Sequence, residues 1–316
     1  LLAEYFAEDH VSIIGGDSSV AAEFSSLPFD HILFTGSTNV GKKVMAAAAR
    51  NLTPVTLELG GKSPVIVSKD YPLEEASQRI LWGKTTNAGQ TCVAPDYALI
   101  PRGKTDDLKV WMSRHFRTMF PKGADSPDYT SIIDEVNFIR LNRLIDDAEK
   151  KGAEVVRMEN PTDFHQKRKK LPFTLVINPP KDSLIMKEEI FGPILIVLEV
   201  DSVDEAIDYV NDRERPLALY YFGHSESERE NVLKNTIAGG VAINDVLMQY
   251  LQVSLPFGGV GSSGFGSYHG REGFDTFSHK KSVFTQRGVG RFTGTKLIYP
   301  PYTSLGRSII KMMGGG

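Results

Sequence analysis

The sequence predicts an α/β protein with a largely parallel sheet. Short apolar segments alternate with amphipathic segments of helical spacing along most of the chain, which is the pattern of consecutive β–α–β units. Several apolar segments end in glycine, as strands do where a turn follows. The composition also fits a globular protein, because 41% of the 316 residues are hydrophobic and 24% are charged.

The elements fall into two successive sets. The opening residues 1–10 look like the end of an amphipathic helix. Apolar runs predict the strands of the first set at 11–16, 31–36, 53–61 and 64–68. Helical spacing predicts its helices at 18–27, at 39–51, which is rich in the helix formers Ala and Lys, and at 73–89.

The second set continues the same alternation. We expect strands at 153–158, 174–178, 194–200, 217–223 and 239–245. We expect helices at 106–120, 135–152, 202–213 and 226–236, with Ser202 as the N-cap of the third. The charged segment 163–170 is expected to be a solvated loop.

Charge and cysteine content exclude several classes of protein. A formal net charge of −3 gives no basic surplus for a nucleic-acid backbone. A single cysteine allows no internal disulfide and suits a reducing compartment, so we expect a cytoplasmic, or at least intracellular, protein. No apolar run is long enough to span a bilayer, and the chain does not open with a secretory signal.

Two glycine motifs resemble nucleotide-binding fingerprints without matching them. Residues 36–43 follow the phosphate-loop pattern until Lys43, which stands where a hydroxyl must hold magnesium. This turn can still approach a dinucleotide phosphate, because a helix N-terminus favours anions. Residues 259–264 fit the letters G-x-G-x-x-G, but no β–α–β unit follows, so we interpret them as a loop that shapes the backbone.

Cys92, within NAGQTCVAP, admits two interpretations. A lone cysteine is often a small buried hydrophobe, but it can also be a nucleophile. Glu58 ends an apolar strand, where a carboxylate is costly unless it has a function. Burial would raise its pKa and suit it to act as a general base beside a thiol nucleophile, while backbone N–H groups near Cys92 could stabilise an oxyanion.

Five motifs carry a resemblance to a known family. FTGSTNVGK, TLELGGKSP, NAGQTCVAPDY, EEIFGPIL and LPFGGVGSSGFGSYHG occur in the order and spacing found in NAD(P)-dependent aldehyde dehydrogenases, and Glu58 and Cys92 are separated by the usual 34 positions. CVAPDY, the segment from SYHG to GFDTFSH and the late YPPY look most like the class 3 and fatty-aldehyde branch. The similarity covers nearly the whole chain.

The resemblance implies an aldehyde dehydrogenase-like fold of the α/β class. Residues 1–58 would be the remainder of a partial Rossmann-type cofactor domain, and residues 59–254 an α/β catalytic domain. Residues 255–316 would supply the glycine-rich segment of the active site and a tail used in oligomerisation, as expected of a homodimer. Because the family's chains are longer, we expect an N-terminally truncated form that lacks the first cofactor-domain strands and the asparagine of the oxyanion hole. The tail is too short to span a bilayer, so we expect no membrane contact.

The resemblance also implies the chemistry. Cys92 would attack an aliphatic or aromatic aldehyde, hydride would pass to NAD or NADP, and Glu58 would activate the water that releases the carboxylic acid. No metal is expected. The residues implied for the cofactor are Thr35, Gly36, Ser37, Val40, Leu59, Glu189 and Phe191. Phe257 and His269 would line the aldehyde tunnel, whereas Asp96 and Tyr97 are expected to be structural and Glu188 a surface charge.

Three other functions remain open on the sequence. A CoA-acylating dehydrogenase would pass the acyl group to a thiol, although Glu58 favours water. A non-catalytic dimerisation remnant fits a truncated chain, although the pair of Cys92 and Glu58 argues against it. A thioesterase or esterase would need the acyl chemistry of Cys92 without any cofactor.

Overall fold

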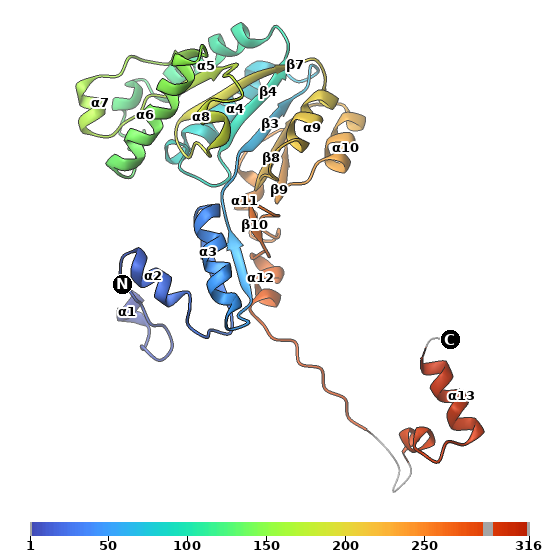
Figure 1. The fold of residues 1–316 in the computed structure, drawn as a ribbon. Coiled ribbons are helices and arrows are strands. Elements are labelled where there is room, and N and C mark those ends of the chain that lie inside the picture. Colours follow the sequence, from blue (N-terminus) through green and yellow to red (C-terminus); the bar gives the residue numbers. More distant parts are fainter. Residues whose placement is uncertain (1, 287–292, 315–316) are drawn as a thin grey trace. The chain divides into compact units, whose positions relative to one another are not determined.

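The computed structural model describes residues 2–286 and 293–314 (Figure 1). The chain divides into two compact units, residues 1–277 and residues 278–316. The first unit contains two sheets, and the second contains two short helical elements. The proposed division at residues 58 and 254 stays a prediction.

The larger sheet of the first unit has seven strands, in the order β5-β6-β7-β4-β3-β8-β9. All neighbouring pairs are parallel except β5 with β6, which is antiparallel. The strands are β3 (Ser63–Val67), β4 (Pro95–Pro101), β5 (Glu154–Arg157), β6 (Thr174–Ile177), β7 (Ile194–Val200), β8 (Ala218–Phe222) and β9 (Gly240–Ile243).

Both faces of this sheet are buried, because successive side chains alternate between two cores. In β4, Ala98 and Ile100 belong to one apolar cluster, whereas Tyr97 and Leu99 belong to the other. The same alternation runs through β3, β7 and β8. Continuous apolar strands, rather than alternating ones, are what a sheet covered on both faces requires.

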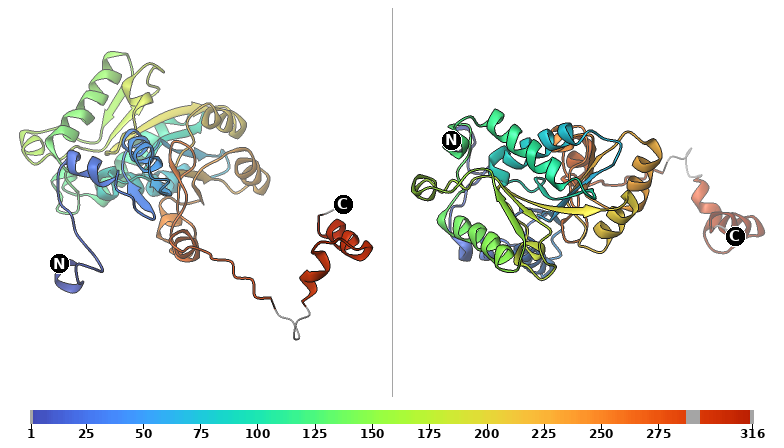
Figure 2. Two further views of the ribbon diagram at one scale, coloured as in Figure 1. Left: turned by 60° about the horizontal axis from the view of Figure 1, so that its bottom comes forward. Right: turned by 90° about the horizontal axis from the view of Figure 1, so that it is seen from above.

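Helices cover the two faces (Figure 2). Apolar residues of α4 (Leu73–Thr85) and α5 (Thr105–Met119) join the first cluster. Those of α6 (Glu135–Lys150), α8 (Leu184–Lys187), α9 (Val203–Asn211) and α10 (Glu226–Asn235) join the second. Ser202 caps α9 as the sequence predicts, because its hydroxyl accepts a hydrogen bond from the Glu205 N–H at 3.1 Å.

The smaller sheet has the order β1-β2-β10. Its strands are β1 (Ile32–Thr35), β2 (Val55–Glu58) and β10 (Gly264–Phe265). β1 runs parallel to β2, and β10 runs antiparallel with Gly264 opposite Glu58. α3 (Thr38–Ala49) packs beside β1 and β2, as Figure 1 shows. Gly264 (φ 153°) could not carry a side chain, because a Cβ there would collide with the Leu57 carbonyl.

The shorter of the two connections between the sheets joins β2 to β3, and the longer one joins β9 to β10. β2 ends at Glu58 and β3 begins at Ser63, so residues 59–62 carry the chain from one sheet into the other. The remaining helical elements of this unit are α1 (Leu2–Tyr5), α2 (Ser18–Phe24), η1 (Thr86–Gly89), η2 (Gly123–Asp125), α7 (Asp163–Lys167), α11 (Met248–Leu251) and α12 (Gly270–Thr276). Because β3 and β4 are parallel, with Ser63 opposite Pro95, the end of β2 lies near the amino ends of both strands.

The second unit contains η3 (Gly294–Ile298) and α13 (Ser304–Met313). The Thr303 hydroxyl caps α13 by accepting from the Gly306 N–H at 3.1 Å. Leu305, Met312 and Met313 are exposed, so the apolar side chains of this amphipathic helix are only partly covered within the unit. Across the two described stretches, no helix is both long and apolar enough to cross a bilayer.

Most sequence-predicted elements are confirmed to within a few residues, and two predictions are wrong. Residues 11–16 form no strand, since they pair with no described strand and leave Val11, Ile13 and Ile14 exposed. The expected loop 163–170 contains α7, with His165 buried and its Nε2 3.0 Å from Asp125. The pattern of residues 11–16 indicated strand propensity, but a strand also needs a neighbour.

Candidate active site

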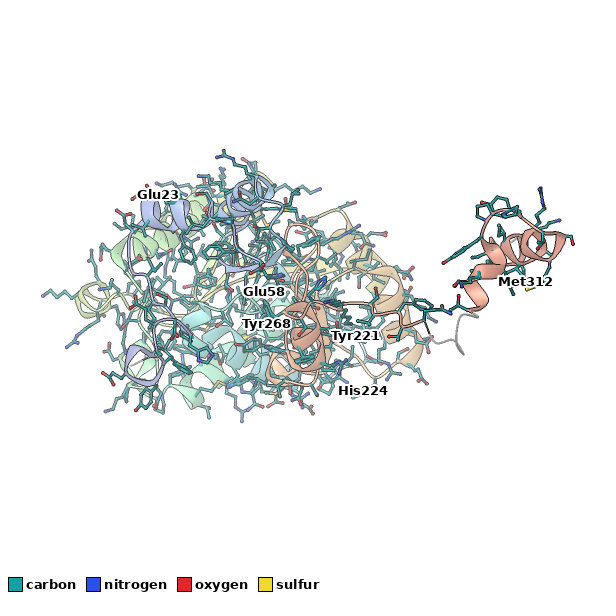
Figure 3. The ribbon with its side chains drawn as sticks, turned by 90° about the horizontal axis from the view of Figure 1, so that it is seen from below. Glu23, Glu58, Tyr221, His224, Tyr268 and Met312 are labelled. Atoms are coloured by element: carbon teal, nitrogen blue, oxygen red, sulfur yellow. The ribbon has the colours of Figure 1, made fainter. Side chains whose placement is uncertain are left out.

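Glu58 is a buried carboxylate at the junction of the two sheets. Its residue is only 3% exposed, and neither carboxylate oxygen has a hydrogen-bond partner among the described residues. Burial without compensating donors penalises the charged form and raises the pKa of Glu58 to about 8. Tyr268 lies beside it in Figure 3, where the charge of Glu58 adds to burial in raising the pKa of the tyrosine. Glu58 is thus suited to take up a proton near neutral pH.

The segment before Cys92 is a left-handed turn. Asn87, Ala88 and Gly89 have φ of 51°, 52° and 71°, so α4 cannot continue and the chain reverses its winding. Non-glycine residues rarely adopt this conformation. The turn is fixed by two reciprocal bonds of 3.0 Å, from the Asn87 amide to the Gln90 carbonyl and from the Gln90 amide to the Asn87 carbonyl.

Gln90 also ties this turn to a distant segment. Its Nε2 donates to the Ser131 carbonyl at 3.1 Å, and its Oε1 accepts from the Ile133 N–H at 2.9 Å. Both donors and the oxygen of the Gln90 side-chain amide therefore have partners that hold the turn. This explains locally why glutamine stands two residues before Cys92 in NAGQTC.

The Cys92 thiol is half-buried and free. Burial raises its pKa to about 11, and the negative charges of Glu189 and then Glu58 add to the rise. The nearby backbone N–H groups of Cys92 and Val93 act in the opposite sense and lower this pKa. The thiol is therefore protonated at rest, two carboxylates are close enough to act on it electrostatically, and two amides are available to an anion at this place.

A chain of hydrogen bonds lies behind the Cys92 loop. The hydroxyl of buried Tyr220 donates to the Val93 carbonyl at 2.5 Å, and the Gln249 amide donates to that hydroxyl at 3.3 Å. Neither residue was singled out from the sequence. Tyr220 lies within an apolar strand, where an aromatic residue signals only packing, so no pattern distinguishes it.

The residues expected at the nucleotide form a strand-to-helix turn. Thr35 ends β1 opposite Glu58, and the Gly36 N–H donates to the Glu58 carbonyl at 3.0 Å. Ser37 is the N-cap of α3, accepting from the N–H of Val40 at 3.4 Å, and Val40 is 43% exposed. Exposed amides at the start of α3 suit a phosphate group, while the Val40 side chain offers an apolar surface.

Glu189 lies against the connection that follows Glu58. Its carboxylate lies against Gly60, where a Cβ would collide with it, and the Gly61 N–H donates to it. Burial raises the pKa of Glu189 to about 7, with a further contribution from Asp96. Phe191, two residues on, has φ of 47° and presents an exposed ring. Leu59 is buried, and its N–H donates to the Ser263 carbonyl at 3.1 Å.

Phe257 and His269 belong to a cluster of four rings with Tyr250 and Tyr268. The Phe257 and His269 rings stack with centroids 5.4 Å apart, and Tyr268 meets both edge-on. His269 Nδ1 is buried and has no hydrogen-bond partner in the part of the chain described here. The cluster lies near Glu58 and Cys92, because both groups influence the Tyr268 hydroxyl electrostatically.

Lys84 is a buried cation that sequence reasoning missed. It is 1% exposed, and burial lowers its pKa to about 8, against the opposing pull of Asp96 and Glu189. The signal was present, because Ala76, Ile80 and Lys84 recur every fourth residue on the buried face of α4. A lysine on such a face indicates a specific partner.

The expected groups therefore converge on one place, while Asp96 and Tyr97 are buried and Glu188 pairs with Arg143 at the surface. Among residues 2–286 and 293–314, no three His, Cys, Asp or Glu side chains are grouped as metal ligands. The arrangement has the groups that acid–base and nucleophilic chemistry requires. A lone thiol lies within electrostatic reach of a desolvated carboxylate, beside a turn that suits a nucleotide.

These features agree with the family comparison. The model of the aldehyde dehydrogenase family matches residues 6–283, and the chain belongs to that family. It is 50% identical over 313 residues to a probable coniferyl aldehyde dehydrogenase of Pseudomonas aeruginosa, covering 99% of this chain and 64% of the relative. It is 42% identical to the mouse aldehyde dehydrogenase named dimeric and NADP-preferring, covering 95% of this chain and 65% of the relative.

A solved structure shows the same fold. The substrate-bound AldH of Staphylococcus aureus superposes with a TM-score of 0.86 at 40% identity, covering 98% of this chain and 66% of the other. The chain thus spans somewhat less than two thirds of the length of these relatives.

We expect Gly89→Ala to perturb the Cys92 loop more than a matched glycine change. Gly89 and Gly103 have similar φ, 71° and 78°, but only at Gly89 would a Cβ collide with a carbonyl, that of Gly192. Gly103→Ala should cost about 1 kcal/mol in unfolding free energy, from backbone strain alone. Gly89→Ala should cost more and should speed alkylation of Cys92 by iodoacetamide, because the displaced loop exposes the thiol. Equal losses and equal alkylation rates would contradict this account.

The pH dependence of Cys92 alkylation tests the electrostatics. A pKa near 11 rather than 9 leaves about a hundredfold less thiolate at pH 7 than an exposed cysteine has. Glu58 is mostly neutral at pH 7 and ionised at pH 9, so Glu58→Gln should speed alkylation clearly at pH 9 and little at pH 7. Glu188→Gln serves as the control. An alkylation midpoint at or below pH 9 in the unaltered chain would refute the assignment.

Proposed function

We propose that this chain oxidises an aldehyde to the carboxylic acid with NAD or NADP, using Cys92 as nucleophile. One observation carries the proposal: the only thiol of the chain lies within electrostatic reach of Glu58, a carboxylate buried without a hydrogen-bond partner among the described residues. A packing cysteine needs no such neighbour, and a structural glutamate would be paired.

Glu58 supports the proton transfers. Because its pKa lies near 8, it can hold the proton that the thiol gives up as sulfur bonds to the aldehyde carbon. The carbonyl oxygen then gains negative charge, which the nearby backbone N–H groups of Cys92 and Val93 would stabilise. A bound nicotinamide would accept the hydride of this adduct, which leaves an acyl group on sulfur.

Release of the acid uses the same carboxylate. After Glu58 has released the thiol's proton to solvent, it takes a proton from water. The resulting hydroxide oxygen bonds to the acyl carbon, the carbon–sulfur bond breaks to give the acid and the Cys92 thiolate, and the proton on Glu58 returns to the sulfur. Burial favours this step because few solvent molecules hydrogen-bond to the Glu58 carboxylate, which leaves it more basic toward the attacking water. The preference for water over an external thiol rests on Glu58.

The residues present fit a dinucleotide. The start of α3, with Thr35, Gly36, Ser37 and Val40, would hold the phosphates, and the Leu59 backbone would face the nicotinamide amide. Glu189 would bind ribose hydroxyls and Phe191 would pack on the ring. Gly60 supports this fit, because only glycine lets the Glu189 carboxylate lie so close to residues 59–62.

We assign an aromatic aldehyde as the preferred substrate. The four rings of Tyr250, Phe257, Tyr268 and His269 give an aromatic surface next to Glu58 and Cys92, and rings pack well on rings. The Pseudomonas aeruginosa relative bears the name of an aromatic aldehyde, which supports this choice.

We further propose a homodimer working inside the cell. The mouse relative is named dimeric, and an enzyme whose only cysteine must remain a thiol suits a reducing compartment. Small-molecule aldehydes are the expected partners, and the acidic net charge of −3 favours no nucleic acid.

The first test follows NADH or NADPH formation by the purified chain with cinnamaldehyde. We expect reduced cofactor from the unaltered chain and none from Cys92→Ala. Glu58→Gln should lower turnover by about 10²–10⁴-fold, because a general base contributes that much, whereas Glu188→Gln should have no effect. A folded chain that makes no reduced cofactor, or a Cys92→Ala variant that still makes it, would overturn the proposal.

The second test concerns the substrate class. Aromatic pairs contribute about 0.5–1.5 kcal/mol beyond area, so Phe257→Leu should lower the preference for cinnamaldehyde over octanal, as a ratio of kcat/KM, by about two- to tenfold. Phe265→Leu is the matched control, since Phe265 is 57% exposed. An unaltered ratio in Phe257→Leu would remove the ring cluster from the substrate site.

A further inference from the structure

Residues 188–190 form an irregular loop whose backbone is held by charged side chains. The Nζ of Lys62 donates to the carbonyls of Ile185 at 2.8 Å and Glu188 at 2.9 Å. The Ile190 N–H donates to Asp96 Oδ2 at 2.9 Å. The loop, which presents Glu189 and Phe191, thus obtains from two side chains the hydrogen bonds that a helix or sheet would supply.

Lys62 and Asp96 also pair with each other, through Nζ and Oδ1. The lysine side chain is 16% exposed and the aspartate side chain 3%. Both carboxylate oxygens of Asp96 and at least three directions around Nζ are therefore used, which is the condition under which a buried ion pair is tolerated. The pair joins three segments that lie far apart in the sequence: 58–62, 92–97 and 185–191.

Arg140 of α6 completes the support from the opposite side. Its guanidinium donates to the carbonyls of Glu189 at 3.1 Å and Ile190 at 2.7 Å. Lys84 and Glu189 are the other charged groups that face Asp96 in the interior, while Glu188 and Arg143 lie at the rim and pair at 3.1 Å. The interior contacts are desolvated, whereas those at the rim are screened by water.

We propose that the Lys62–Asp96 ion pair is a positioning unit for the nicotinamide end of the cofactor site. By fixing the backbone of residues 188–190, the pair sets where the Glu189 carboxylate and the Phe191 ring stand. It touches neither cofactor nor substrate. The expected effect on cofactor affinity rests on the proposed function. The expected effect on the conformation of residues 188–190 does not.

The structural part is measured by hydrogen exchange without any cofactor. In the unaltered chain the Ile190 amide should exchange slowly, because it is buried and bonded to Asp96. Asp96→Asn and Lys62→Gln should speed exchange over residues 186–192. Arg143→Gln, which breaks only the exposed pair on the same loop, should not. An Ile190 amide that exchanges as fast as exposed loop amides in the unaltered chain overturns the inference without any variant.

The functional part is measured as affinity for NAD and NADP. The two interior variants, Lys62→Gln and Asp96→Asn, should each weaken cofactor binding about tenfold, which is the size expected when a hydrogen-bonded charge loses its partner. Arg143→Gln should weaken it by less than about twofold. The double variant Lys62→Gln/Asp96→Asn should lose no more than either single variant, because the two residues act as one unit. Exchange of the backbone amides of β8 (Ala218–Phe222) should be unchanged in Lys62→Gln, which separates a displaced loop from general unfolding.

The outcomes separate the two proposals. Binding that is normal in all folded interior variants refutes the positioning role and leaves the proposed function intact. An unaltered chain that binds neither cofactor refutes the proposed function, and the exchange of residues 186–192 still decides whether the pair holds the loop. Additive losses in the double variant would refute the pair as a unit.

Discussion

The link between the two sheets constrains every other part of the site. Only residues 59–62 separate the end of β2 from the start of β3, so Glu58, two glycines and Lys62 are held close together in this short connection. Glu58 is left without hydrogen-bond partners among the described residues, Gly60 admits the Glu189 carboxylate, and Lys62 reaches Asp96. A change in the length of this connection would move Glu58 relative to β4 and to Cys92, which lies just before that strand.

The site is assembled from locally unfavourable choices. A carboxylate without donors, a left-handed turn containing Asn87 and Ala88, and a fully buried lysine each cost free energy. They persist because the seven-stranded sheet is apolar on both faces and fixes the positions of the elements that carry them. Such conflicts between local preference and global fold are expected where function, rather than stability, selects the residue.

Much of the fold could be predicted from the sequence because strand and helix periods are local. Apolar runs predict buried strands such as 63–67 and 194–200, and Ser202 predicts the start of α9. Glu58 and Cys92 were recognisable from motifs. The contacts of Lys62, Arg140 and Tyr220 could not be predicted, because their partners lie tens of residues away in the sequence. The strand predicted at residues 11–16 was wrong, because a strand also needs a neighbouring strand that no single segment reveals.

The raised pKa of the Cys92 thiol has a consequence for the lifetime of the protein. Peroxides oxidise thiolates and not thiols, so a cysteine that keeps its proton at rest is a poor target for conversion to sulfenic acid. In the proposed reaction, burial next to Glu189 and Glu58 would protect the sulfur between turnovers, and the thiolate would form only while an aldehyde is present to react with it. The same electrostatics that slow its alkylation would make the nucleophile durable in an oxidising challenge.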